Sequence, residues 1–233
     1  MKICVIVPTL NEGKNIYKIF KKIKKTKIKL DVLFIDDNSL DKTQSFIKEL
    51  KKKNKNIKYI FRKNKTGIGS AHKEGIRFCY KKKYNLIITM DADGTHDPKY
   101  FKKMISKSKK FDCVITSRFK KPNLLKGWPL SRKIFTYSRH FAVKFFLGID
   151  YDASGAYRCF RVKKIKLQDI LSSKYNDYAF FWEVTYNLHK KNYSIFEMPV
   201  ELVYRKLGNS KMKLKHIIYS LFYLFIKSIE KKI

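Results

Sequence analysis

Short apolar runs alternate with amphipathic segments through the first half of the chain. The apolar runs cover residues 3–7, 31–35, 57–61, 86–89 and 113–116. Between them, apolar residues recur three or four positions apart, as in Ile16, Ile19 and Ile23, which is the spacing of one helix face. Mostly apolar strands joined by helices are typical of a mostly parallel sheet that has helices on both faces. The pattern therefore predicts an α/β fold, with Asn11 as the cap of the first helix.

The pattern changes after residue 117, where longer amphipathic segments replace the alternation of short strands and helices. A polar loop at residues 120–129 is the only soft boundary, so we expect one domain. The segments 132–147 and 214–229 each predict a helix with a wide apolar face that is rich in aromatic residues. Amphipathic helices that also carry basic residues suit a membrane surface, although the alternative is that each helix packs on the sheet. In the helix predicted at 132–147, the apolar half carries Ile134, Phe135, Tyr137, Phe141, Ala142, Phe145 and Phe146. The polar half of the same helix carries Arg132, Lys133, Arg139, His140 and Lys144.

The net charge is extreme. Lysine and arginine number 54 and aspartate and glutamate 19, which gives +35 over 233 residues. Such a charge suggests a polyanionic partner, either nucleic acid or an anionic membrane. The excess of lysine over arginine, with abundant Ile, Asn, Tyr and Phe, fits the bias of an AT-rich genome equally well. Because the planar guanidinium binds phosphate in a fork that lysine lacks, the few arginines are the better indicators of a phosphate site.

The spacing of the cysteines and the length of the apolar runs indicate in which cellular compartment the chain is expected. The four cysteines are scattered, with no spacing typical of a metal site, and are expected to be buried in a reducing compartment. The N-terminal residues have a strand pattern rather than that of a signal peptide. The longest apolar run, residues 217–226, is about half of the ~20 residues that a spanning helix needs. We therefore expect a cytoplasmic chain without a membrane span.

Acidic turns follow three of the predicted strands. Glu12 follows the first, Asp36 and Asp37 the second, and Asp91 and Asp93 the strand at 86–89. The carboxyl ends of parallel strands share one edge of a sheet, where ligands bind in open α/β folds. Carboxylates gathered in one cleft of a chain with a charge of +35 fit a cation that bridges to phosphate. Hard oxygen ligands favour Mg²⁺ or Mn²⁺, and neither a P-loop nor a G-x-G-x-x-G motif is present.

These turns also occur in a recognisable order. The chain resembles the family 2 inverting glycosyltransferases of GT-A fold in Pro8-Thr9-Leu10-Asn11-Glu12, Asp36-Asp37-Asn38-Ser39, Gly67-Ile68-Gly69-Ser70-Ala71, Asp91-Ala92-Asp93 and Thr116-Ser117-Arg118-Phe119. Later segments resemble the dolichol-phosphate (polyprenol-phosphate) mannosyltransferase branch of that family. These are Gly127-Trp128-Pro129 with Arg132, residues 152–158, and Arg205 through Gly208, Ser210 and Lys211.

The resemblance implies a function and a set of site residues. The branch transfers mannose from GDP-mannose to a polyprenyl phosphate. The nucleotide would contact Pro8, Leu10, Glu12, Ile35 and Asp37, and Asp91, Ala92, Asp93 and Thr95 would surround the diphosphate and metal. The metal ligands would be Asp91, Asp93 and Thr95, although Thr95 stands where many relatives have Gln. Phosphates and the lipid head group would contact Arg118, Arg132, Thr136, Arg205 and Lys211, and the catalytic set would be Asp91, Asp93, Arg118 and Arg132.

The implied domain plan is a single GT-A domain over residues 1–233. It divides into a nucleotide-binding half at 1–117, an acceptor-binding half at 118–211 and a C-terminal amphipathic helix at 212–233. The implied place is peripheral, at the cytoplasmic face of a membrane. The partners would be the nucleotide sugar, the polyprenyl phosphate, the anionic membrane surface and a possible membrane-anchoring subunit.

The physical chemistry of the implied reaction is consistent with these residues. A lipid phosphate, whose second pKa is near ~6, is largely ionised at neutral pH and needs no general base. A metal on Asp91 and Asp93 would stabilise the departing diphosphate, and arginines would align the acceptor. Such a single displacement inverts the anomeric centre.

Three alternatives remain beside this interpretation. Within the class, the donor could be UDP-glucose or another nucleotide sugar, or the acceptor could differ. A basic nucleic-acid-binding protein would interleave arginines and aromatics on one face, whereas the aromatics here lie on apolar helix faces, so we expect no nucleic-acid partner. A catalytically inactive membrane scaffold has no need to retain Asp91, Asp93, Arg118 and Arg132.

Three further residues carry expectations of their own. Arg158 is expected to support the loop of Asp152 rather than to bind a substrate. His96 is expected to be a residue of the turn rather than a metal ligand. Glu183, placed among Phe180, Phe181 and Trp182, could be either structural or functional.

Overall fold

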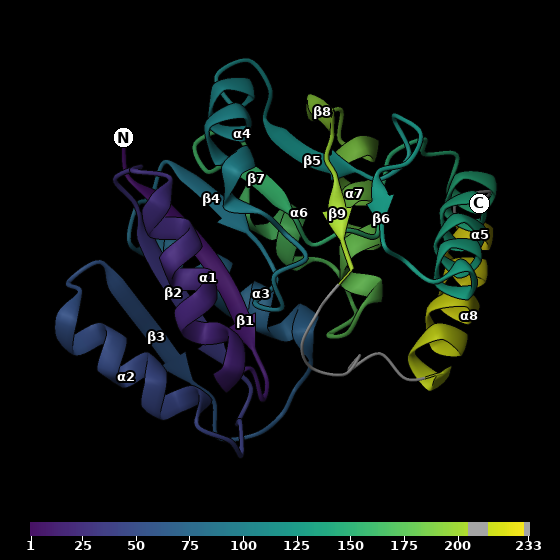
Figure 1. The fold of residues 1–233 in the computed structure, drawn as a ribbon. Coiled ribbons are helices and arrows are strands. Elements are labelled where there is room, and N and C mark those ends of the chain that lie inside the picture. Colours follow the sequence, from purple (N-terminus) through teal and green to yellow (C-terminus); the bar gives the residue numbers. More distant parts are fainter. Residues whose placement is uncertain (205–213, 231–233) are drawn as a thin grey trace.

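The computed structural model describes residues 1–204 and 214–230, and its centre is a seven-stranded sheet (Figure 1). The strand order is β3 (Ile57–Phe61), β2 (Asp31–Asp36), β1 (Ile3–Thr9), β4 (Leu86–Thr89), β7 (Arg158–Arg161), β5 (Cys113–Ser117) and β8 (Ile195–Pro199). Only β7 runs antiparallel to its neighbours in this sheet. A separate parallel pair joins β6 (Leu125–Lys126) to β9 (Leu202–Val203).

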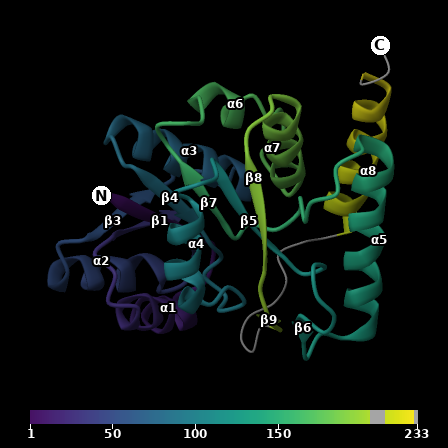
Figure 2. The ribbon, with the colours of Figure 1, turned by 90° about the horizontal axis from the view of Figure 1, so that it is seen from above.

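Helices cover both faces of the sheet (Figure 2). On one face lie α1 (Gly13–Lys25), α2 (Thr43–Lys53) and α4 (Phe101–Lys107), which follows a 3₁₀ turn at Pro98–Tyr100. On the other lie α3 (Ile68–Lys81), α6 (Leu167–Leu171) and α7 (Ala179–Lys190). Alternate residues of β1 enter the two cores, with Val5 in one and Ile6 in the other. The α/β fold with a mostly parallel sheet and helices on both faces is confirmed.

The register of the parallel strands brings the acidic turns to one edge. Pro8 of β1 pairs with Ile35 of β2, and Ile6 of β1 pairs with Thr89 of β4. The three strands therefore end together, and the loops after Thr9, Asp36 and Thr89 leave the sheet at the same side.

The cap expected for the first helix is wrong. Helix α1 begins at Gly13, whose backbone N–H donates to the Asp41 carboxylate at 3.0 Å. Asn11 has a positive φ of 52°, and its side chain accepts from the backbone N–H of Leu40 at 2.9 Å. An asparagine that tolerates the left-handed region serves better here as a bridge between two loops than as a cap. The loops after β1 and β2 are thereby tied together.

Strand β7 was not evident in the sequence because an arginine stands at each of its ends. Arg158 is 2% exposed, and its guanidinium donates to the backbone carbonyls of Ala153, Gly155 and Phe181. These bonds allow a charged residue in an interior strand. They also fix the loop of Asp152, so the structural role expected for Arg158 is confirmed.

The two long amphipathic helices lie beside each other at one side of the molecule (Figure 2). Helix α5 (Leu130–Leu147) and α8 (Leu214–Glu230) pack together with α7 through a small core that includes Val143, Trp182 and Tyr223. Much of the apolar half of α5 faces solvent, since Phe141 and Phe145 are 67% and 71% exposed. The two helices thus pack on each other and on α7, and membrane contact of the exposed part stays a prediction. Among the described residues, no helix is long and apolar enough to cross a membrane.

Glu183 has a structural role at this junction. Its buried carboxylate accepts from the Ser173 hydroxyl, the Lys174 backbone N–H and the Tyr223 hydroxyl. The Trp182 indole donates to Ser220 at 3.1 Å. The helix α8 is thus attached to α7 by two polar contacts inside an apolar cluster.

Gly69 provides a test of how the two parts of the chain meet. A Cβ at this position of α3 would lie 2.6 Å from Phe180 Cβ and 2.8 Å from the backbone of both Asn176 and Asp177. We predict that Gly69→Ala lowers the free energy of unfolding by about 2 kcal/mol or more, because backbone atoms must move. Gly155→Ala is the matched control, since its Cβ would meet no atom closer than 3.9 Å. Chemical denaturation checks both, and equal effects would contradict the close packing.

Candidate active site

A tight turn after β4 holds the two central carboxylates in place. The backbone N–H of Asp91 donates to His96 Nδ1 at 2.9 Å, and that of Thr95 donates to Asp93 Oδ1 at 3.0 Å. Gly94 between them has φ of 83°, a conformation that other residues rarely adopt. His96 is buried and stacks on Tyr157 with ring centroids 4.9 Å apart. His96 therefore positions the turn, in agreement with the expectation that it is a residue of the turn.

The first aspartate after β2 is a structural residue. Asp36 is fully buried, and its carboxylate accepts from Thr9, Ser39 and Gln44. It closes the turn between β2 and α2 and has no open side toward a ligand. The acidic dipeptide thus contributes one candidate contact, Asp37, rather than two.

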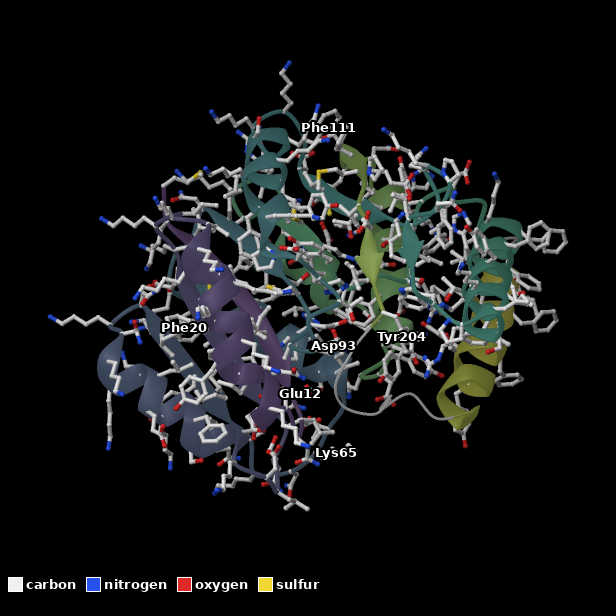
Figure 3. The ribbon with its side chains drawn as sticks, viewed as in Figure 1. Glu12, Phe20, Lys65, Asp93, Phe111 and Tyr204 are labelled. Atoms are coloured by element: carbon white, nitrogen blue, oxygen red, sulfur yellow. The ribbon has the colours of Figure 1, made fainter. Side chains whose placement is uncertain are left out.

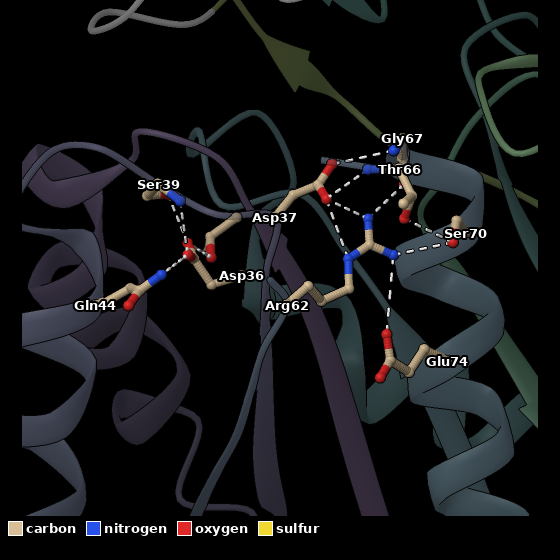
Figure 4. Close-up of polar contacts among 10 residues, drawn as sticks. Asp36, Asp37, Ser39, Gln44, Arg62, Thr66, Gly67, Ser70 and Glu74 are labelled. Carbon is tan, nitrogen blue, oxygen red and sulfur yellow. Dashed lines mark hydrogen bonds and ion pairs between the residues drawn. The ribbon is translucent and has the colours of Figure 1, made fainter. Parts of the chain in front are cut away.

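Asp37 lies in a polar network that the sequence did not reveal (Figure 4). Its carboxylate accepts from Arg62 Nε and Nη2 and from the backbone N–H groups of Thr66 and Gly67. Arg62 also donates to Ser70 at 3.0 Å and pairs with Glu74 at 3.9 Å. The only available signal was position, because Arg62 follows β3 at the same edge where the acidic turns follow their strands. A nucleotide that contacts Asp37 must share it with Arg62.

A cavity of about 140 Å³ joins the acidic turn to the second half of the chain. It brings together six of the predicted site residues, namely Asp91, Asp93, Thr95, Arg118, Arg132 and Thr136. Trp128, Phe135, Tyr178 and Phe181 add aromatic surface to its wall. The cavity therefore combines carboxylates, guanidiniums and apolar surface within one space.

A larger cavity of about 340 Å³ adjoins it, since both are lined by Asp93 and Thr95. Lys18 and Lys22 of α1 line its other side. Figure 3 shows Asp93 and Tyr204, which both line this second space. The acidic turn is thus accessible from two directions.

Arg118 and Asp152 form a buried ion pair at the back of the smaller cavity. Arg118 Nε donates to Asp152 Oδ2 at 2.7 Å, Nη2 bonds Oδ1, and the Arg118 backbone N–H adds a third bond at 2.9 Å. Burial raises the pKa of Asp152, but the Arg118 charge and its hydrogen bonds lower it by more, so the net pKa is lowered. For Arg118, burial lowers the pKa and the Asp152 charge raises it by more. The pair therefore stays ionised and neutralises itself.

Helix α5 supplies the other two guanidiniums of this cavity. Arg132 and Arg139 both line it, with the buried Thr136 between them on the helix. Arg139 was assigned only to the polar half of the helix, and in the structure it lines the cavity together with Phe135 of the apolar half. Burial, and then the nearby Arg118 charge, lower the pKa of Arg139 to about 10. Arg139 is thus a cation near the acidic turn that sequence reasoning had not included in the site.

The remaining predicted residues lie elsewhere. Pro8 lies near the end of β1, and Leu10 and Glu12 lie in the turn that follows it. All three are half-buried, and Glu12 accepts from the Asn15 side chain at 2.7 Å. Ile35 is fully buried in the core, so it lies beneath the edge and not on it. Ala92 is buried and lines the larger cavity. Arg205 and Lys211 lie outside the described residues.

The acidic turn fits a hard divalent cation. Asp91 and Asp93 are partly exposed, and both face the cavity that contains the guanidiniums. Within residues 1–204 and 214–230, no cluster of three or more His, Cys, Asp or Glu side chains is arranged for a metal. Two carboxylates suit Mg²⁺ or Mn²⁺, which usually take the rest of their ligands from substrate phosphate and water.

Sequence comparison identifies the family. The model of glycosyl transferase family 2 matches residues 4–168, more than half of the chain. The chain belongs to this family. Two relatives of this glycosyltransferase are an undecaprenyl-phosphate mannosyltransferase from Micrococcus luteus and a polyprenol monophosphomannose synthase from Mycolicibacterium smegmatis. The first is 28% identical, and the match covers 91% of this chain and 88% of the relative. The second is 27% identical, and the match covers 94% of this chain and 83% of the relative.

Structural comparison agrees with the fold. Glucosyl-3-phosphoglycerate synthase from Mycobacterium tuberculosis, solved with Mn²⁺, UDP and glucosyl-3-phosphoglycerate, matches with a TM-score of 0.67 at 14% identity. The match covers 98% of this chain and 78% of that one. The GT-A fold is thereby confirmed, and the two mannosyltransferase relatives confirm the resemblance to the polyprenol-phosphate branch of the family.

The buried ion pair gives this glycosyltransferase a testable acid sensitivity. Asp152→Asn leaves the Arg118 charge without its partner, so we expect the free energy of unfolding to fall by about 3–5 kcal/mol at pH 7. Because folding lowers the Asp152 pKa, the pair stabilises the protein above the unfolded pKa of about 3.9 and loses this effect as pH falls.

Thermal unfolding from pH 7 to pH 3 measures this dependence. The difference in Tm between the wild type and Asp152→Asn should narrow as the pH falls below about 4. Asp150→Asn is the control, because Asp150 pairs with Lys144 on the exposed surface. A constant difference across this range would contradict the assignment.

Proposed function

We propose that this glycosyltransferase moves mannose from GDP-mannose to a polyprenyl phosphate at the cytoplasmic face of a membrane. The observation that carries the proposal is the cavity that sets Asp91 and Asp93 opposite Arg132 and Thr136. The names of the two mannosyltransferase relatives support the sugar and the acceptor class. The choice of guanine as the base of the donor is supported by the family resemblance alone.

The acidic turn forms the leaving-group side of the proposed site. Asp91 and Asp93 would hold Mg²⁺ or Mn²⁺, which would neutralise charge that develops on the departing diphosphate. Thr95 keeps the Asp93 carboxylate oriented through its backbone N–H. Pro8, Leu10, Glu12 and Asp37 would contact the nucleoside at the neighbouring strand ends.

The opposite wall forms the acceptor side of the proposed site. Arg132 donates charge-assisted hydrogen bonds to the acceptor phosphate, and the Thr136 hydroxyl lies four residues further along the same helix face. Arg118 is already engaged by Asp152, so its main task is to hold the wall in shape. The ionised phosphate attacks the sugar without a general base, and one displacement inverts the anomeric centre.

The exposed side of α5 and α8 supports the proposed membrane location. Large apolar side chains on these two helices face solvent, and Phe141, Phe145 and Phe222 are each more than 60% exposed. Several large apolar side chains exposed on two neighbouring helices are typical of an interaction site rather than of ordinary surface. Because α5 also lines the cavity, a lipid held at this surface would have its phosphate close to Arg132.

A panel of radiolabelled nucleotide sugars tests the proposed reaction directly. The full chain is incubated with each sugar donor, Mg²⁺ or Mn²⁺, and vesicles that contain polyprenyl phosphate. We expect labelled lipid from GDP-mannose and little from UDP-glucose or UDP-GlcNAc. If lipid is labelled only from another donor, the proposed base and sugar are wrong and those of that donor take their place. If no donor labels the lipid, the proposal is refuted.

Asp93→Asn tests the role of the acidic turn in the same assay. We expect metal-dependent turnover to fall by a factor of about 100 or more, with an unchanged Tm, because the side chain loses its charge and keeps its shape. Asp112→Asn is the matched control, since Asp112 bonds Ser194 before β5, away from the cavity. Retention of activity in Asp93→Asn would show that the metal assignment is wrong.

Vesicle flotation tests the proposed membrane surface. Phe141→Ser with Phe145→Ser should lower the bound fraction on anionic vesicles at least about tenfold, because each Phe side chain contributes about 1.5–3 kcal/mol of apolar burial. The control is Leu40→Ser with Tyr59→Ser, which removes two exposed apolar residues near β2 and β3. Equal binding by both double variants would place the membrane contact elsewhere.

A further inference from the structure

Three polar residues of α5 form a stripe that faces the cavity. Arg132, Thr136 and Arg139 stand at positions 0, +4 and +7 of the helix, a spacing that places side chains on one face. All three line the same cavity as Asp91 and Asp93. The resemblance to known glycosyltransferases assigned Arg132 and Thr136 to phosphate, and it assigned nothing to Arg139.

The guanidinium of Arg139 has no ion-pair partner of its own among the described residues, although the charge of Asp152 acts on it. Its Nε is buried and has no hydrogen-bond partner, and no ion pair joins it to a carboxylate within residues 1–204 and 214–230. Its ring contact is with Phe135, whose centroid lies 5.9 Å from the guanidinium carbon. The carboxylate whose charge acts on Arg139, that of Asp152, is already bonded to Arg118. The lowered pKa of Arg139, caused first by burial and then by Arg118, reflects the same deficit.

We propose that Arg139 binds the phosphate of the acceptor lipid, together with Arg132, and so completes an anion site on α5. The inference rests on the proposed function, because it names a further residue of that site. A buried donor without a partner costs free energy unless a ligand satisfies it. A phosphate offers several acceptor oxygens and up to two negative charges, which matches two guanidiniums and one hydroxyl.

The position of Arg139 favours the acceptor over the donor diphosphate. Arg139 belongs to the helix whose other side exposes Phe141 and Phe145. The carboxylates that would hold the diphosphate lie across the cavity, on the sheet edge. A lipid held at the exposed surface of α5 is therefore expected to place its phosphate on the α5 side of the cavity, where Arg132 and Arg139 lie.

Kinetics of three variants test the assignment. Arg139→Met removes the charge at similar length, Arg139→Lys keeps the charge, and Arg77→Met is the matched control on an exposed position of α3. With farnesyl phosphate as a soluble acceptor, we expect Arg139→Met to raise the acceptor KM about tenfold or more and the donor KM less than about twofold. Arg139→Lys should recover part of the loss, and Arg77→Met should match the wild type. An unchanged acceptor KM, or an equal rise in both KM values, would overturn the proposal.

Thermal unfolding without donor gives a second, activity-independent measurement. Without ligand, Arg139→Met should unfold about 2–4 °C above the wild type, because it removes a half-buried cation whose Nε has no hydrogen-bond partner. Farnesyl phosphate should raise the Tm of the wild type by more than that of Arg139→Met at the same concentration, and farnesol should raise neither. An equal shift by farnesyl phosphate in both proteins would contradict the proposal. A smaller shift by GDP with Mn²⁺ in Arg139→Met, with an unchanged farnesyl phosphate shift, would contradict it as well.

The two measurements separate the inference from the function on which it rests. If the wild type transfers no sugar from any donor, the proposed function fails, and the farnesyl phosphate shift still decides whether Arg139 binds a phosphate. If the wild type transfers mannose and Arg139→Met behaves like the wild type in both measurements, only the role of Arg139 fails.

Discussion

The charge pattern of the cleft depends on one buried ion pair, between Arg118 and Asp152. Their hydrogen bonds hold the end of β5 against the loop before β7, and their charges cancel. The cleft is then left with carboxylates on the sheet edge and two guanidiniums, Arg132 and Arg139, on α5. If either Asp152 or Arg118 were unpaired, its buried charge would need a new partner, and one of the charged groups of the cleft would have to supply it. The ion pair thus keeps the other charges available for ligands.

Helix α5 connects two environments because its two sides have opposite character. One side lines the cavity with polar groups, and the other exposes aromatic side chains to solvent. In a typical globular protein the apolar side of such a helix would face the core. Helix α8 extends the same apolar surface and is attached through Glu183 and Tyr223. Under the proposed function, this arrangement lets a lipid stay at the membrane while its phosphate reaches the catalytic cavity.

The sequence predicted the framework of the fold and the acidic edge well, because both depend on local patterns. Apolar runs defined the parallel strands, and the turn that contains Asp91 and Asp93 follows from the end of one of them. Contacts between distant segments were not predictable in the same way. Asp37 is engaged by Arg62, twenty-five positions away, and Arg118 by Asp152, thirty-four positions away. Periodicity separated apolar from polar positions of α5, but it did not show that Arg139 shares the cavity side with Phe135 and Thr136.

A crystal structure of the full chain with GDP and Mn²⁺, measured at the manganese absorption edge, tests the central claim most directly. The account predicts an anomalous peak bonded to carboxylate oxygens of Asp91 or Asp93, with the diphosphate between this peak and the guanidiniums of α5. A manganese peak bound to other residues, or a diphosphate bound away from this turn, would contradict it.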